Sequence, residues 1–175
     1  MYSNDSEKQS LARKIMQRKA RDNARTPVQW SDAAHAGFTT PSSTPWMRVN
    51  DDYTQVNVAF QLSGPKAASS VHAFWQRSLA HRKQNKDLYV YGDFEAVENE
   101  DVETEKEVFA YRRWSAERSV LVLLNFCGKK LQWRLGELRV EKWVKGNYEV
   151  EEWNGKEKSG AVTLEPWEGL VGELA

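Results

Sequence analysis

The sequence contains few of the residues that build covalent or metal-bound frameworks. It has one cysteine, Cys127, and three histidines in 175 residues. A single cysteine excludes an internal disulfide framework and any zinc site that needs two or more thiolates. His72 and His81 lie on one predicted helix about two and a half turns apart, so they cannot share a metal ion. We therefore predict no metal site and no bound cofactor.

An excess of charge and a long apolar run are also missing. Lys and Arg number 25, and Asp and Glu number 25, so the formal net charge is zero. A general nucleic-acid-binding protein needs positive charge to displace counterions, so this class is disfavoured. No apolar run approaches the ~20 residues of a membrane-spanning helix. Residues 1–10 are polar and lack a signal region, so we expect a cytoplasmic protein with neither nucleic acid nor membrane as partner.

Common catalytic motifs are absent as well. The sequence has no His-Glu-x-x-His, no P-loop, no Gly-x-Ser-x-Gly and no glycine-rich dinucleotide motif. Cys127 directly follows a strongly apolar segment, which favours a packed thiol over a nucleophile. Asp and Glu are plentiful, but the pattern singles out no pair for acid–base chemistry. The residue pattern alone identifies no active site.

Tryptophan, in contrast, is abundant, with eight residues. Indole rings stack on apolar surfaces, including the C–H faces of sugars, so carbohydrate binding is one hypothesis. The favoured alternative is that most of the eight lie in a core, because aromatic residues dominate the energetics of burial.

The clearest helical pattern covers residues 69–85. Ser69 or Ser70 is the predicted N-cap of this helix, and basic residues gather at its C-terminal end. One apolar stripe runs along the helix and consists of Val71, Phe74, Trp75 and Leu79. A stripe of this strength predicts that the helix docks against a partner surface.

The segment before this helix is largely aperiodic. Residues 5–20 predict a helix with one apolar face, formed by Leu11, Ile15 and Met16. Residues 21–66 then show no sustained period and contain four of the five prolines. Loops of this length inside a domain are either functional or disordered. The aromatic residues of this one predict a loop that packs against another surface.

From residue 88 onward, short strand patterns alternate with turn signals. The apolar run Ser119–Phe126 predicts a central strand. Further strands are predicted at residues 88–97, 108–114, 131–135, 142–144, 148–150, 161–164 and 167–174. Asn154-Gly155 predicts a hairpin turn, and the acidic residues 95–107 predict an exposed connection. Many short strands of this kind predict an antiparallel β-sandwich.

Residues 21–30, Arg-Asp-Asn-Ala-Arg-Thr-Pro-Val-Gln-Trp, resemble a signature of the α-glucosidase branch of glycoside hydrolase family 13, the α-amylase family. Further blocks follow in that family's order at residues 36–40, 45–46, 49–50, 69–83, 91–93, 108–111, 121–126 and 164–168. The likeness covers nearly the whole chain. The sequence is similar to the fungal maltases of this family in particular. Val28 and Ser31 depart from the family, which usually has Met and often has Asp there.

The resemblance implies a mainly β fold class with N-terminal helices. Residues 1–87 are expected to be the tail end of a catalytic (β/α)8 barrel, comprising a helix, a loop on the active-site side and the last barrel helix. Residues 88–175 are expected to form the C-terminal antiparallel β-sandwich called domain C. We expect the barrel to be incomplete, because the sequence resembles only the C-terminal portion of the family's enzymes.

The resemblance also implies that the catalytic acids are missing. In the family, the nucleophile lies in a Gly-x-Arg-x-Asp strand and a third acid lies in Asn-His-Asp, and neither motif occurs in this sequence. The general acid Glu also belongs to the upstream portion. Because a retaining double displacement needs a nucleophile and an acid, we assign no catalytic residue and expect the chain to be inactive alone.

One substrate-binding residue carries over from the family. The first Arg of the Arg-Asp-Asn block helps define the glucose pocket and pairs with an acid from an early barrel loop, and in this sequence it is Arg21. A guanidinium offers forked donors that suit a carboxylate and sugar hydroxyls. The alternative for Arg21 is a solvated charge after a helix. Arg25, Gln29 and Trp30 are expected to brace the loop.

Two functions follow from these observations. The first is a C-terminal fragment of an α-glucosidase whose full-length parent takes α-glucoside or malto-oligosaccharide substrates. The alternative is a non-catalytic β-sandwich module that binds carbohydrate or a protein partner. In the first case the stripe on helix 69–85 would lack the barrel elements that normally cover it. Because burial of each large side chain is worth roughly 1.5–3 kcal/mol, we expect the chain to self-associate through this stripe.

Overall fold

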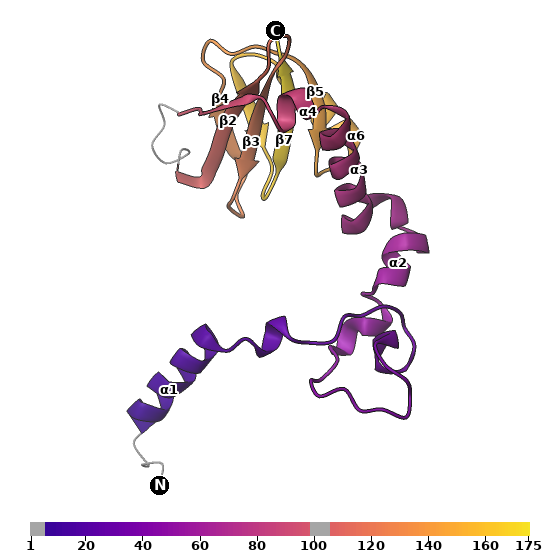
Figure 1. Ribbon diagram of the computed structural model, residues 1–175. Helices are drawn as coiled ribbons and strands as arrows, with labels where there is room; N and C mark the ends of the chain where they lie inside the picture. The colour runs from indigo at the N-terminus through magenta and orange to yellow at the C-terminus, as the bar shows by residue number, and fades with distance from the viewer. Residues whose placement is uncertain (1–5, 99–105) are drawn as a thin grey trace. The chain divides into compact units, whose positions relative to one another are not determined.

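The computed structural model of the chain describes residues 6–98 and 106–175. It divides into two compact units, Met1–Ala73 and Phe74–Ala175, which are described separately (Figure 1). Within the described residues no helix combines the length and the apolar character that crossing a membrane requires. The boundary predicted after residue 87 concerns parts of a larger protein and stays a prediction.

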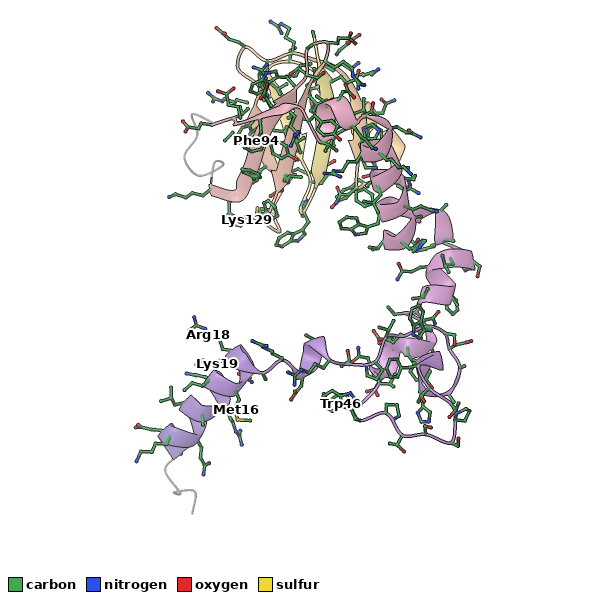
Figure 2. All side chains as sticks on the ribbon, in the orientation of Figure 1. Met16, Arg18, Lys19, Trp46, Phe94 and Lys129 are labelled. Carbon is green, nitrogen blue, oxygen red and sulfur yellow. The ribbon has the colours of Figure 1, made fainter. Side chains whose placement is uncertain are left out.

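The first unit is built from short helices and irregular backbone. In chain order its elements are α1 (Ser6–Lys19), η1 (Asp22–Ala24), η2 (Ala34–Gly37), η3 (Asp51–Thr54), α2 (Val58–Ser63) and η4 (Ala67–Ser69). Helix α1 confirms the prediction for residues 5–20, of which Asp5 lies outside the described residues. Its expected apolar face is exposed, as Met16 shows in Figure 2 beside the basic Arg18 and Lys19.

The second unit carries all of the strands that the structure describes. Helix α3 (Val71–Gln84) starts in the first unit and continues into the second, followed by α4 (Lys86–Tyr89) and, further along the chain, α6 (Val150–Asn154). The Ser70 hydroxyl accepts a hydrogen bond from the Ala73 amide at 3.1 Å, which confirms the predicted N-cap. The strands are β1 (Asp93–Ala96), β2 (Val108–Trp114), β3 (Ser119–Asn125), β4 (Leu131–Arg134), β5 (Val140–Gly146), β6 (Ala161–Leu164) and β7 (Gly169–Leu174).

The strands form two antiparallel sheets. The larger sheet has the order β1-β2-β3-β7-β5, and the smaller one pairs β4 with β6. Strand β3 therefore lies in the middle of the larger sheet, as its apolar sequence predicts (Figure 1). Residues 99–105 of the predicted acidic connection lie outside the described residues, but β1 and β2 on either side of it pair in antiparallel register, with Ala96 opposite Tyr111.

Side chains from both sheets make one hydrophobic core. The inward positions of β3 contribute Leu121 and Leu123, and the smaller sheet contributes Trp133 and Val162. Alternation along β2, β3 and β6 places every second side chain of these strands in this core. The expectation that most of the eight tryptophans are buried is wrong, because Trp30, Trp46, Trp75 and Trp167 are exposed. All four of these exposed rings lie outside the strands, where little surface is available to cover them.

The prediction of a strand over residues 88–97 is wrong for its first half. Residues Lys86–Tyr89 form helix α4, and only Asp93–Ala96 is a strand. Arg113 of β2 donates from Nε to the Leu88 carbonyl at 3.1 Å and from Nη2 to the Gly92 carbonyl at 2.7 Å. Leu88 is 1 % exposed. The buried leucine and these bonds outweigh the strand propensity of Tyr89-Val90-Tyr91.

A second arginine holds helix α4 from the turn after β2. Arg118 donates to Asn85 Oδ1 at 2.8 Å and to both carboxylate oxygens of Asp87 at 3.0 and 2.9 Å. The Arg118 guanidinium lowers the pKa of Asp87, chiefly through these hydrogen bonds. His81 Nε2 lies 3.0 Å from the Tyr89 hydroxyl, and burial raises the pKa of Tyr89 to about 12.

The predictions for residues 148–155 are also wrong. Tyr148–Val150 is not a strand, and Asn154-Gly155 ends helix α6 instead of turning a hairpin. The Tyr148 hydroxyl donates to the Pro166 carbonyl at 2.7 Å, which holds this segment against the turn before β7. Trp153 packs against the core. These contacts with distant residues override the local turn signal.

A buried ion pair lies beneath the same turn. Glu168 is 1 % exposed, and its Oε2 accepts from Lys156 Nζ at 3.0 Å and from the Glu165 amide at 2.6 Å. Lys156 Nζ also donates to the Thr163 carbonyl at 2.6 Å. Glu168 Oε1 has no hydrogen-bond partner in the part of the chain that the structure describes. The carboxylate therefore depends on Lys156 for its compensation.

Candidate functional site

Arg21 lies two residues after the end of helix α1, in the first unit. The next three residues form the turn η1, and the Arg21 carbonyl accepts from the Ala24 amide at 3.0 Å. The residue is exposed. Over residues 6–98 and 106–175 its guanidinium has no hydrogen-bond or ion-pair partner. All of its donors are therefore available to a carboxylate or a hydroxyl.

Gln29 ties together three parts of the loop that follows. Its Nε2 donates to Asp52 Oδ1 at 3.1 Å and to the Val56 carbonyl at 2.6 Å. Its Oε1 accepts from Asn50 Nδ2 at 3.1 Å, and its carbonyl accepts from the Val58 amide at 2.9 Å. Gln29 thus braces the loop, as its place in the 21–30 block predicts.

Asn57 fixes the junction between the loop and helix α2. Its side chain is buried, accepts from the Phe60 amide at 2.9 Å and donates to the Tyr53 carbonyl at 2.8 Å. An asparagine oxygen at this position caps the first turn of a helix. The irregular segment is therefore a folded loop held by amide side chains.

A left-handed turn shapes the centre of the loop. His35, Ala36 and Gly37 have φ values of 53°, 58° and 66°, a conformation that costs energy for residues with a Cβ. The Ala36 carbonyl accepts from the amides of Trp30 and Ser31 at 2.8 and 3.1 Å. These two bonds hold the strained turn in place. Strain maintained in this way is a feature of ligand-binding and catalytic loops.

A shallow hollow lies next to the Arg21 turn. It measures about 350 Å³ and is lined by Asp22, Thr26, Met47, Arg48, Asn50 and Asp51. Two of these residues form an exposed ion pair in which the Arg48 guanidinium donates to the Asp51 carboxylate, and this hydrogen bond raises the pKa of Arg48. The lining carries both hydrogen-bond donors and acceptors, which suits a polyhydroxylated ligand.

The aromatic side chains of the loop are exposed. Trp30, Phe38 and Trp46 are each about half or more accessible, and Trp46 projects from the loop at 75 % exposure (Figure 2). The predicted packing of these rings against another surface is not formed inside this unit. Exposed rings of this kind can stack on a sugar ring or on a further protein surface.

Within the described parts of the chain, no acid–base pair is bonded to Arg21. Among the described residues, no group of three or more His, Cys, Asp and Glu lies close enough to hold a metal ion. The residues that line the hollow offer donors and acceptors for binding, but none is a nucleophile with an adjacent base. The hollow therefore offers hydrogen-bond donors and acceptors to a ligand.

The apolar stripe of helix α3 is only partly covered. Val71, Trp75 and Leu79 are exposed, whereas Phe74 is half-buried. Lys145 Nζ lies 5.0 Å from the centre of the Phe74 ring, a cation–π distance. The partner surface predicted for this stripe is thus not supplied by the described residues, and self-association stays a prediction.

The family profile described as "Alpha amylase, catalytic domain" matches residues 1–92, more than half of the chain. The chain belongs to the α-amylase family, glycoside hydrolase family 13.

Named relatives place the chain near the α-glucosidases of that family. It is 40 % identical over 119 residues to an α-glucosidase of Schizosaccharomyces pombe, covering 68 % of this chain and 19 % of that protein. It is 35 % identical over 168 residues to an oligo-1,6-glucosidase of Bacillus cereus, covering 92 % of this chain and 27 % of that protein. The chain thus spans about a quarter of the length of the curated relatives it matches.

A solved structure shows the same likeness in three dimensions. The isomaltulose synthase of Klebsiella sp. LX3 superimposes with a TM-score of 0.74 at 26 % identity. The superposition covers 89 % of this chain and 26 % of that protein. The described helices and antiparallel sheets are therefore an arrangement that occurs within larger members of the family.

Proposed function

We propose that the chain serves as the C-terminal part of an α-glucosidase, an enzyme that releases terminal α-linked glucose from maltose- or isomaltose-type oligosaccharides. The observation that carries this proposal is the family's Arg-Asp-Asn block, folded into an exposed turn with a free guanidinium at Arg21. The α-glucosidase and oligo-1,6-glucosidase names of the relatives support the substrate class.

In this proposal Arg21 binds substrate and does not catalyse. Its forked donors would hold a hydroxyl of the terminal glucose together with a carboxylate supplied by an earlier part of the enzyme. The brace centred on Gln29 and the turn at residues 35–37 keep the following loop folded, which limits the entropy lost when sugar binds. Bond cleavage requires a nucleophile and a general acid from outside this chain.

The two units then have different roles. The first unit and helix α3 correspond to the end of a (β/α)8 barrel and carry the active-site-side loop. The second unit corresponds to the β-sandwich called domain C. Its two antiparallel sheets around one core support this assignment. The exposed stripe on α3 is the face that other barrel elements would cover.

A chimera tests the proposal. The stretch of the S. pombe α-glucosidase that aligns with this chain is replaced by the corresponding residues of this chain, and hydrolysis of a chromogenic α-glucoside is measured. We expect the chimera to be active and Arg21→Ala to lower kcat/KM by about ten- to hundredfold, the loss of a charged hydrogen bond to sugar.

Two controls make the result specific. Arg18→Ala, at an exposed position of helix α1 three residues earlier, removes an equal charge and is expected to leave kcat/KM within about threefold of the chimera. The chain by itself is expected to show no turnover. Hydrolysis by the isolated chain, or an active chimera that is indifferent to Arg21→Ala, would overturn the assignment.

A further inference from the structure

The larger sheet has an end that the smaller sheet does not cover. The core includes Val108 and Ala110 of β2, but not Arg112 and Trp114, which follow on the same side of the strand. Trp114 pairs with Ser119 of β3 in the antiparallel register. A hollow of about 410 Å³ lies at this end and is lined by Arg112, Trp114, Ser115, Ser119, Glu141 and Glu173, among others. Its volume falls in the range of small-molecule sites, about 300–1,000 Å³.

Three polar atoms at this hollow are buried and lack partners. They are Arg112 Nε, Ser115 Oγ and Ser119 Oγ, and no residue that the structure describes bonds to any of them. An unpaired polar atom away from water costs free energy, so three such atoms in one place need an explanation. The Arg112 guanidinium carbon lies over the Trp114 ring, 5.6 Å from its centre, and both residues line the hollow.

The mixed chemistry of the lining selects the class of ligand. A simple anion would meet the Glu141 carboxylate as well as Arg112, and an apolar ligand would leave the three polar atoms unpaired. Sugar hydroxyls both donate and accept, so they match a guanidinium, two serine hydroxyls and the Glu141 carboxylate at once. The C–H face of a pyranose ring packs on an indole.

We propose that this hollow is a binding site for a neutral saccharide, which stacks on Trp114 and hydrogen-bonds to Arg112, Ser115 and Ser119. The site belongs to the second unit alone and does not depend on Arg21 or on any catalytic activity. It gives the β-sheet unit a carbohydrate-binding function of its own.

The test uses the full ¹⁵N-labelled chain titrated with maltotriose and followed by NMR. We expect a saturable shift of the Trp114 indole signal, assigned through Trp114→Phe, and of the amides around residues 112–119 at millimolar sugar. Ser119→Ala is expected to weaken binding about two- to tenfold, the loss of one hydrogen bond. It should not lower stability, because the hydroxyl it removes has no partner.

Arg112→Met removes the guanidinium while keeping an unbranched apolar side chain, and we expect it to abolish the saturable shift. Matched controls are Arg134→Met on the smaller sheet and Trp167→Ala, an exposed indole that does not line the hollow; both should bind as the unaltered chain does. The proposal fails if maltotriose causes no saturable shift of Trp114. It fails equally if Ser119→Ala binds with unchanged affinity, or if acetate shifts the same signals more strongly than the sugar.

Discussion

The buried ion pair of Lys156 and Glu168 gives the sharpest test of how the second unit is stabilised. Lys156→Met keeps the length of the side chain but leaves the Glu168 carboxylate, 1 % exposed, without its counter-charge. The carboxylate would retain only the Glu165 amide, because its Oε1 has no partner among the described residues. The Thr163 carbonyl would also lose its donor.

The expected loss in the free energy of unfolding is about 3–5 kcal/mol, the usual cost of leaving a buried charge uncompensated. A domain of this size is stable by only about 5–15 kcal/mol, so the variant should lie close to unfolding. Hydrogen exchange of the β3 amides measures this directly, because those amides lie in the central strand and open only when the sheet does.

Two comparisons show whether burial of the charge is the cause. Lys158→Met, at an exposed lysine two residues along, is expected to change stability by less than about 0.5 kcal/mol. The double variant Lys156→Met/Glu168→Gln removes the orphaned charge and should be at least about 2 kcal/mol more stable than the single variant. A cost for Lys156→Met no larger than that of Lys158→Met would refute the reasoning.

Three further predictions concern the loop, the pH response and association. Gly37→Ala places a Cβ 2.6 Å from Ser31 Oγ at a φ of +66°, so exchange of the loop amides bonded to the turn should become faster. Burial and the Lys145 ammonium lower the pKa of His81 below 6.5. The unfolded chain then binds the proton more tightly, so stability is complete above pH 6.5 and declines as the pH falls through the lowered pKa, as urea unfolding at stepped pH should show. Leu79→Glu should reduce self-association of the full chain in sedimentation velocity, because it places a charge in the exposed stripe.

Each of these predictions has a control in the same chain. Gly160→Ala has a similar positive φ but meets nothing within 4 Å, so it should perturb its surroundings less than Gly37→Ala. His81→Gln should remove the decline in stability below pH 6.5, and its persistence would contradict the assignment to His81. Arg82→Glu reverses a charge on α3 outside the stripe, and equal effects of this change and Leu79→Glu would show that charge, not the stripe, controls association.

The sequence pattern was sufficient to predict a strand where the alternation or the apolar character of its residues was uninterrupted. Val108–Trp114 and Ala161–Leu164 alternate and form strands with the predicted bounds, and the apolar Ser119–Asn125 takes the centre of the sheet. Pattern failed where distant groups compete with propensity. Arg113 holds Leu88–Tyr89 in a helix against strand-forming neighbours, and the Tyr148 contact with the turn before β7 displaces an expected strand.

The two proposed binding sites also differ in how far the sequence predicts them. The Arg21 block could be found from sequence because ten consecutive residues carry a family signature, and the brace at Gln29 belongs to the same block. The hollow at Arg112 carries one weak signal only, an arginine where the inward alternation of β2 would place an apolar residue. Nothing in the sequence brings Ser115 and Ser119 to the same hollow.

The amino-acid sequence by itself determined the family, the succession of helices and then strands, and the absence of the motifs that carry the catalytic acids, because each depends on residues adjacent in the chain. Only the tertiary structure decided which side chains are left without partners. That property depends on groups brought together across strands and turns, such as Lys156 beneath Glu168 or Arg112 above Trp114. Hydrogen-bond satisfaction is a sum over spatial neighbours, and sequence order does not specify those neighbours.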